Sequence, residues 1–255
     1  MKTLLLGNSH TGCILIASKE AGERLDTFGI PGGLGPDLEF TDGYVKKGQR
    51  HGKDPKTNIP DALTKGVRLA DYGSILFSTL GSADPQFANR RHPLVRFARA
   101  DMVTSADPTL PLASQSLLEL LIEAFVVGMF ATQSLIALSQ NFRGPIYVQP
   151  VPLPLRSSLD PTVTPTTALY GDNATAVLSW YFKYQFGVME RIVGGLGPNV
   201  QLLPYPDLAA LETGFSPDTY AVVQSNPWHL SDFYGGMILD QVKRLRTQSA
   251  GTVPA

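Results

Sequence analysis

The sequence predicts an α/β protein built on a parallel, doubly wound sheet. Apolar runs with the length of strands alternate with helical patterns from one end of the chain to the other, which is typical of this class. The runs end in turns that contain glycine or proline, so successive strands are expected to deliver their loops to one edge of the sheet. No internal repeat and no boundary to a second domain is visible, and we expect one domain over residues 1–255.

The first half of the chain begins with a strand, a turn and a helix. The apolar run at residues 4–6 leads directly into Gly7, and a helical pattern follows through residues 13–19. A second strand is predicted over residues 25–30, which end in a glycine-rich turn. Residues 73–80 form a hydrophobic run between glycines, with β-branched and aromatic members, so we expect the central strand there.

The second half continues the alternation. An apolar helix is predicted over residues 114–141, buried across one face of the sheet, and strands are predicted over residues 146–151 and 200–203. A helix over residues 174–193 carries a stripe that we expect in the core: Trp180, Tyr184, Val188 and Ile192. The chain closes with a helix over residues 237–245 and a frayed tail.

Residues 41–71 are polar and locally basic, and they interrupt the alternation of strands and helices. Their glycine, proline and aspartate content predicts an excursion over the surface that closes with a helix over residues 60–69. A lid, or a contact for an anionic substrate, is the alternative interpretation of this insertion.

Composition excludes several classes of protein. The hydrophobic content of 43% supports a sizeable core, and a net charge of −1 does not indicate a nucleic-acid partner. The single cysteine, Cys13, has no internal disulfide partner and is expected as a small buried residue, and no Cys/His cluster has zinc spacing. The chain lacks both G-x-G-x-x-G after its first strand and a P-loop lysine, so no nucleotide cofactor is expected.

The apolar segments also bear on location. The run at residues 4–6 is too short for the core of a signal peptide, which predicts a cytoplasmic protein. The long helix over residues 114–141 contains Glu119 and Glu123, and we therefore expect no membrane span. The sequence makes no prediction of oligomeric state.

Ser9 is the leading candidate for a reactive group. It follows the first strand at the carboxyl edge of the predicted sheet, near the positive end of a helix dipole that favours a developing oxyanion. The alternative is that Ser9 or Asn8 caps the helix. Near the other end of the chain, His229 follows a turn and is a candidate base, and the glycine-rich turn at Gly32 offers backbone N–H donors. Nucleophile, base and donors together indicate acyl transfer.

Four blocks of residues give the chain a resemblance to a known family. Residues 7–9 resemble the Gly-Asp-Ser block of the SGNH hydrolases, also called GDSL-type esterases and lipases. Residues 29–32 are similar to the second block, residues 81–84 to the third, and residues 226–229 with the Tyr-Gly pair at 234–235 to the last. The blocks span nearly the whole chain and occur in the family's order.

The resemblance implies a flavodoxin-like three-layer sandwich with a central five-stranded parallel sheet and no cofactor. It also implies Ser9 as nucleophile, His229 as base, Asn226 at the position of the triad acid, and Ser9, Gly32 and Ala83 at the oxyanion hole. Neighbouring polar residues are candidates for support: Asn8, His10, Asp84, Asn89 and Asp232.

Three positions depart from the family's pattern. Asn8 replaces the aspartate of the first block, Ala83 replaces the asparagine of the oxyanion hole, and Asn226 replaces the triad acid. The predicted activity is that of a serine esterase or acyl-hydrolase on a small acyl ester, with O-acetylated carbohydrate favoured. A carbohydrate or small-molecule acyltransferase and a non-catalytic SGNH-like binding protein are the alternatives.

Overall fold

The computed structural model describes residues 2–8, 10–29, 37–48, 66–82, 92–105, 110–159, 169–221 and 230–250. Its strands are β1 (Thr3–Gly7), β2 (Leu25–Gly29), β3 (Leu38–Thr41), β4 (Tyr44–Lys47), β5 (Val67–Arg68), β6 (Ser74–Leu80), β7 (Ala98–Arg99), β8 (Leu112–Ala113), β9 (Ile146–Pro150) and β10 (Val200–Leu202). Its α-helices are α1 (Thr11–Glu20), α3 (Pro93–Arg96), α4 (Gln115–Gly128), α5 (Phe130–Asn141), α6 (Ala174–Gly194), α7 (Leu208–Thr213) and α8 (Asp232–Ala250). Short 3₁₀ helices are η1 (Leu69–Asp71), η2 (Arg156–Leu159), η4 (Gly171–Asn173) and η5 (Asp218–Tyr220).

The core of the molecule is a five-stranded sheet with the order β10-β9-β6-β1-β2, in which all neighbours are parallel. The expectation of a flavodoxin-like sheet is confirmed, because the strands run 2-1-3-4-5 when numbered along the chain. The run at residues 73–80 was expected in the centre, and β6 indeed occupies the middle position.

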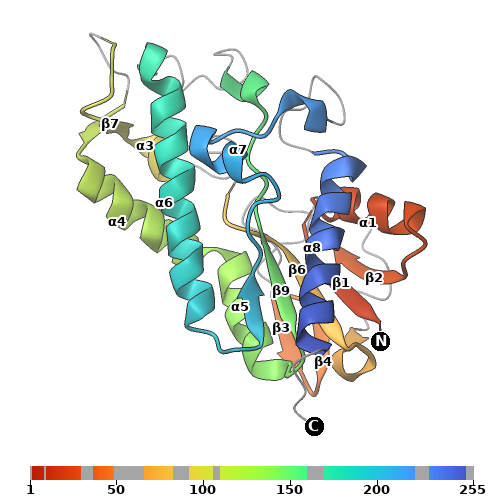
Figure 1. Cartoon of the computed structure of the whole chain (residues 1–255). Helices are drawn as coiled ribbons and strands as arrows, with labels where there is room; N and C mark the ends of the chain where they lie inside the picture. The colour runs from red at the N-terminus through yellow and green to blue at the C-terminus, as the bar shows by residue number, and fades with distance from the viewer. Residues whose placement is uncertain are drawn as a thin grey trace, which may run out of the picture.

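Helices cover both faces of the sheet, which makes the three layers visible in Figure 1. The alternation of side chains along each strand separates the two hydrophobic cores. Leu5 and Leu76 face α1 and α8, whereas Leu6, Ile75 and Phe77 belong to the larger cluster that includes residues of α4, α5 and α6. Helices α1 and α8, from opposite ends of the chain, lie side by side.

The helix expected over residues 114–141 is wrong as one element, because it breaks at Met129 into α4 and α5, bent by 53°. Met129 has an extended backbone after Gly128, which is a poor helix former, and the Thr132 hydroxyl bonds the carbonyl of Val126 at 2.6 Å. Within the described residues no single helix is long and apolar enough to cross a membrane; only the bent pair passes on length and composition.

The insertion is more structured than expected. Strands β3, β4 and β5 form a small antiparallel sheet, and Val45 and Leu69 are buried in the main core. The helix predicted over residues 60–69 is wrong at its end, where Val67 and Arg68 form β5; residues 60–65 lie outside the described residues. The residues of β5 pair with β4, so tertiary pairing decides their conformation.

Two helices differ from their predicted details. The buried face of α6 includes Tyr181, Phe182 and Gln185. Of the expected stripe, Val188 is buried, whereas Trp180, Tyr184 and Ile192 are only partly buried. Helix α8 begins at Asp232, five residues before the predicted start at 237, and runs to Ala250. An acidic residue in the first turn favours this start, since it complements the helix dipole.

Candidate functional site

The order of the sheet identifies one point at its carboxyl edge as a candidate site. The chain passes from β1 to β2 on one side and continues through β6, β9 and β10 on the other. In open α/β sheets, ligands bind outside the carboxyl ends of the strands where the order reverses. In this protein the reversal lies between β1, which ends at Gly7, and β6, which ends at Leu80.

Gly7 closes β1 in a space that admits no side chain. A Cβ at Gly7 would lie 2.6 Å from Cγ2 of Thr11 and 2.7 Å from the carbonyl oxygen of Ser78. The next residue, Asn8, organises the turn: its side-chain oxygen accepts the His10 N–H at 3.0 Å, and its carbonyl accepts from both the N–H and the hydroxyl of Thr11. This Asx turn sets the entry to α1. The N-cap position itself belongs to His10, so the alternative in which Asn8 caps the helix is wrong.

The end of β6 is held by a side chain from α6. Gly81 has a φ of +95°, a conformation that favours glycine, and a Cβ there would lie 3.1 Å from the Gln185 amide carbon. The next residue, Ser82, donates its N–H to Oε1 of Gln185 at 2.9 Å and accepts from Nε2 of Gln185 at 3.1 Å. The chain therefore leaves β6 in a fixed direction.

The C-terminal block is anchored on both sides. Ala221 and Leu230 form an isolated antiparallel bridge, and Ser231 donates its N–H to the Tyr220 carbonyl at 2.8 Å. Leu230 packs in the hydrophobic cluster of α1 and α8. The hydroxyl of Tyr234 is buried, and burial raises its pKa well above the ordinary value.

Most of the predicted site residues lie outside the described residues: Ser9, Gly32, Ala83, Asp84, Asn89, Asn226 and His229. Their roles stay predictions. Three predicted supporting residues are described. Asn8 and His10 flank Ser9 at the end of β1, and Asp232 lies in the first turn of α8, three residues after His229.

Cys13 is buried as expected, on the face of α1 that meets α8. Burial raises the pKa of its thiol to about 12, and the negative charge of Asp232 adds to the rise. A thiol with such a pKa is protonated at neutral pH and is a poor nucleophile. Among the described residues, no three His, Cys, Asp or Glu side chains gather where a metal ion could be held.

Sequence reasoning missed three buried polar residues near the end of β6. Gln185 and Tyr181 lie one turn apart on α6, and His92 precedes α3; none of the three has an exposed side chain. Burial lowers the pKa of His92 from 6.5 to about 3, so its imidazole is neutral. The available signal was a glutamine among the apolar residues of α6, at the i+4 position from a tyrosine.

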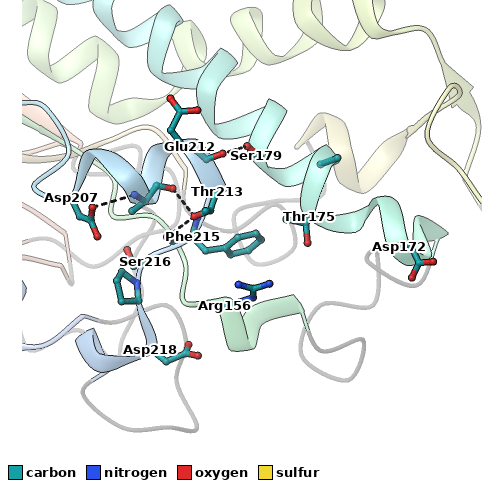
Figure 2. Close-up of a pocket in the computed structure, with 13 residues that line it drawn as sticks. Arg156, Asp172, Thr175, Ser179, Asp207, Glu212, Thr213, Phe215, Ser216 and Asp218 are labelled. Atoms are coloured by element: carbon teal, nitrogen blue, oxygen red, sulfur yellow. Dashed lines mark hydrogen bonds between the residues drawn. The ribbon is translucent and has the colours of Figure 1, made fainter.

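A pocket of about 650 Å³ opens at the same edge of the sheet, beyond β9 and β10. It is bounded by η2, which follows β9, by α7, which follows β10, and by the start of α6 (Figure 2). The side chains of Arg156, Thr175 and Phe215 point into this space. Its size is that of a small-molecule site.

Some of the charged side chains that line the pocket already have partners, and others do not. Glu212 pairs with Lys183 at 2.8 Å, and Asp218 accepts the Ser157 N–H at 3.3 Å. Within the part of the chain that the structure describes, Arg156 and Asp172 form no hydrogen bond or ion pair, although both line the pocket. A cation and an anion are therefore available to a polar ligand.

No family model and no curated protein matches this sequence. A search of solved structures finds a family two carbohydrate esterase from Clostridium thermocellum, solved in complex with cellohexaose. The match has a TM-score of 0.42 and 10% identity, and it covers 99% of this chain and 65% of that chain. At this distance the likeness carries no argument about activity.

Proposed function

We propose that the protein is a serine esterase or acyl-hydrolase in which Ser9 is the nucleophile and His229 the general base. The observation that supports the proposal is the contact between α1 and α8, which begin two residues after Ser9 and three residues after His229. Gly235 lies against the backbone of Cys13 and Ile14, so the two helices that follow Ser9 and His229 in the chain are in contact near their first residues.

In the proposed reaction, Oγ of Ser9 attacks the carbonyl carbon of the ester while His229 accepts the hydroxyl proton. The tetrahedral intermediate collapses with cleavage of the ester C–O bond, and His229 returns the proton to the leaving alcohol. Water then attacks the acyl-serine with His229 again as base, which releases the carboxylic acid and regenerates Ser9. In an acyltransferase, an acceptor hydroxyl would take the place of this water.

The proposed oxyanion hole uses the backbone N–H groups of Ser9 and Gly32. With Ala83 in place of the family's asparagine, one donor is missing, and the loss of a donor costs about 100- to 1000-fold in rate in a comparable hydrolase. Asn226 can orient His229 but cannot stabilise the imidazolium by charge. We therefore expect turnover well below that of a complete triad.

An O-acetylated carbohydrate is the proposed substrate class. The pocket beyond β9 and β10 supports it, because Arg156 and Asp172, which form no hydrogen bond or ion pair within the described residues, can hydrogen-bond sugar hydroxyls. The pocket and the end of β1 share one edge of the sheet, as a substrate that extends from the pocket to Ser9 requires.

The decisive experiment combines labelling with turnover. The protein is treated with a fluorophosphonate probe, the labelled peptide is identified by mass spectrometry, and hydrolysis of p-nitrophenyl acetate is followed. We expect labelling at Ser9, and loss of labelling and turnover in both Ser9→Ala and His229→Ala. Ser231→Ala is the matched control, since its buried hydroxyl has no hydrogen-bond partner within the described residues. Equal turnover in the wild type and both variants would contradict the proposal.

A non-catalytic binding protein is the second candidate, and the pocket itself favours it. In that case, neutral oligosaccharides would bind with measurable heat while Ser9 stays unlabelled. Ala176→Trp places a large side chain in the pocket from an exposed position and should abolish the heat of binding. Labelling of Ser9 by the fluorophosphonate probe would favour the enzyme over the binding protein.

A further inference from the structure

A chain of buried hydrogen bonds runs from α6 to the carboxyl end of β6. Its first member is Gln185, whose amide bonds both the N–H and the carbonyl of Ser82, at 2.9 and 3.1 Å. Both residues are buried, and Gln185 has no exposed surface. The amide therefore holds one residue, Ser82, through the two peptide groups on either side of its Cα, as a neighbouring strand would.

Two further residues extend the chain. The Tyr181 hydroxyl lies 2.8 Å from Oε1 of Gln185 and 2.8 Å from Nε2 of His92. Nδ1 of His92 accepts the Leu94 N–H at 3.1 Å, so the single proton of the neutral ring is on Nε2, and the ring donates to Tyr181. Tyr181 then donates to Gln185.

The network joins two points that are far apart along the chain. Ser82 is the last described residue after β6, and His92 is the first described residue beyond residues 83–91. Helix α6 thus holds the chain on both sides of that segment through Gln185, Tyr181 and His92. Buried polar groups are costly unless they are bonded, and a bonded network fixes one geometry of the backbone.

Gly81 adds a steric reason for this geometry. A Cβ at Gly81 would lie 3.0 Å from Sδ of Met189 and 3.2 Å from Nε2 of Gln185. The backbone at the end of β6 is therefore in direct contact with α6. A shift of the Gln185 amide would be transmitted directly to Ser82, because the two are hydrogen-bonded.

We propose that Gln185 is a positioning residue that fixes the backbone N–H and carbonyl of Ser82, and with them the direction in which the chain leaves β6. The catalytic consequence rests on the proposed function, in which the turn that contains Ala83 borders the oxyanion hole formed by the backbone N–H groups of Ser9 and Gly32, while Ala83 itself supplies no side-chain donor. Oxyanion donors act only when they are held in place before the reaction, and a displacement of about 1 Å can cost about 100-fold in rate. Gln185 acts on this geometry through Ser82 and does not touch the substrate.

The test uses the full-length protein with two substitutions on the same helix. Gln185→Met removes both bonds to Ser82 with little change of volume, whereas Val177→Ala removes buried methyl groups in a separate cluster. Hydrogen exchange of peptides that cover residues 80–92 is the first readout, and kcat and KM for p-nitrophenyl acetate are the second. We expect at least tenfold faster exchange and about 10- to 100-fold lower kcat in Gln185→Met, at unchanged KM.

The outcomes separate the two proposals. Val177→Ala should lose stability but retain wild-type exchange at residues 80–92 and wild-type kcat. If Gln185→Met does not fold, Tyr181→Phe is the second variant. It keeps both bonds between Gln185 and Ser82 but removes the hydroxyl that bonds Oε1 of Gln185 at 2.8 Å and the Ser82 carbonyl at 3.4 Å, and it should give a smaller change of the same sign. Equal exchange in the variant and the control would overturn the positioning role. Wild-type protein that neither turns over ester nor labels at Ser9 would overturn only the proposed function, since the exchange readout needs no activity.

Discussion

Gly235 of α8 lies directly against the backbone of Cys13 in α1. A Cβ at Gly235 would come 2.8 Å from the Ile14 nitrogen and closer still to the carbonyl group of Cys13. The neighbouring Gly236 has no heavy atom within 4 Å of the corresponding point. The first turns of the two helices can approach this closely only because the α8 residue at the contact is glycine.

The two glycines make a matched pair of substitutions. Gly235→Ala forces the helices apart and is expected to lower the free energy of unfolding by about 1–3 kcal/mol. Gly236→Ala meets open space and should raise it by about 1 kcal/mol or less, because alanine is the better helix former. Urea unfolding followed by circular dichroism measures both. If the α1–α8 contact also aligns Ser9 with His229, ester turnover falls in Gly235→Ala alone.

Much of this fold could be predicted because the determining signals are local. The strand expected over residues 73–80 is β6 (Ser74–Leu80), and that expected over 146–151 is β9 (Ile146–Pro150). Hydrophobic runs of strand length between turns are read from adjacent residues. The break at Met129 was missed because hydrophobicity continues across it, while the backbone there is extended.

The candidate site was less predictable, since its geometry depends on long-range contacts. The glycines of the predicted blocks were identified, and Gly7, Gly81 and Gly235 all lie where a neighbouring element leaves little or no space for a Cβ. The bond between Ser82 and Gln185 joins residues 103 positions apart, which no local pattern reveals. Composition also identified Cys13 as a buried residue.

The thiol of Cys13 should be inert in the native protein. With its pKa raised to about 12, only about one molecule in ten thousand carries the thiolate at pH 8. We expect no rapid reaction with a disulfide reagent such as Ellman's until the protein is unfolded, when one thiol per chain should react. Rapid stoichiometric reaction of the folded protein would show that the contact between α1 and α8 opens readily.

The buried imidazole of His92 should make the protein sensitive to acid. Its folded-state pKa of about 3 lies below the unfolded value of 6.5, so the unfolded chain binds the extra proton first as the pH falls. The stability from neutral His92 is complete above pH 6.5 and is lost progressively towards pH 3. At pH 5 the loss is about 2 kcal/mol. Unfolding of His92→Gln should therefore depend less steeply on pH between 6.5 and 4, and an identical slope would contradict this assignment.

The substitution Asn226→Asp tests the proposed mechanism by restoring a function. In the proposed mechanism, a carboxylate at this position would stabilise the imidazolium that forms on His229, and the comparable amide substitution in serine proteases lowers turnover by about four orders of magnitude. We expect kcat for p-nitrophenyl acetate to rise at least tenfold, with the gain lost in the double variant that also carries Ser9→Ala. The gain should disappear at acidic pH as the new carboxyl group and His229 become protonated.

Asn199→Asp is the matched control, because Asn199 bonds the carbonyls of Phe142 and Gly144 before β9, at the opposite edge of the sheet. A rise in kcat in Asn199→Asp as well, or no rise in Asn226→Asp, would argue against a Ser9–His229 pair that residue 226 orients.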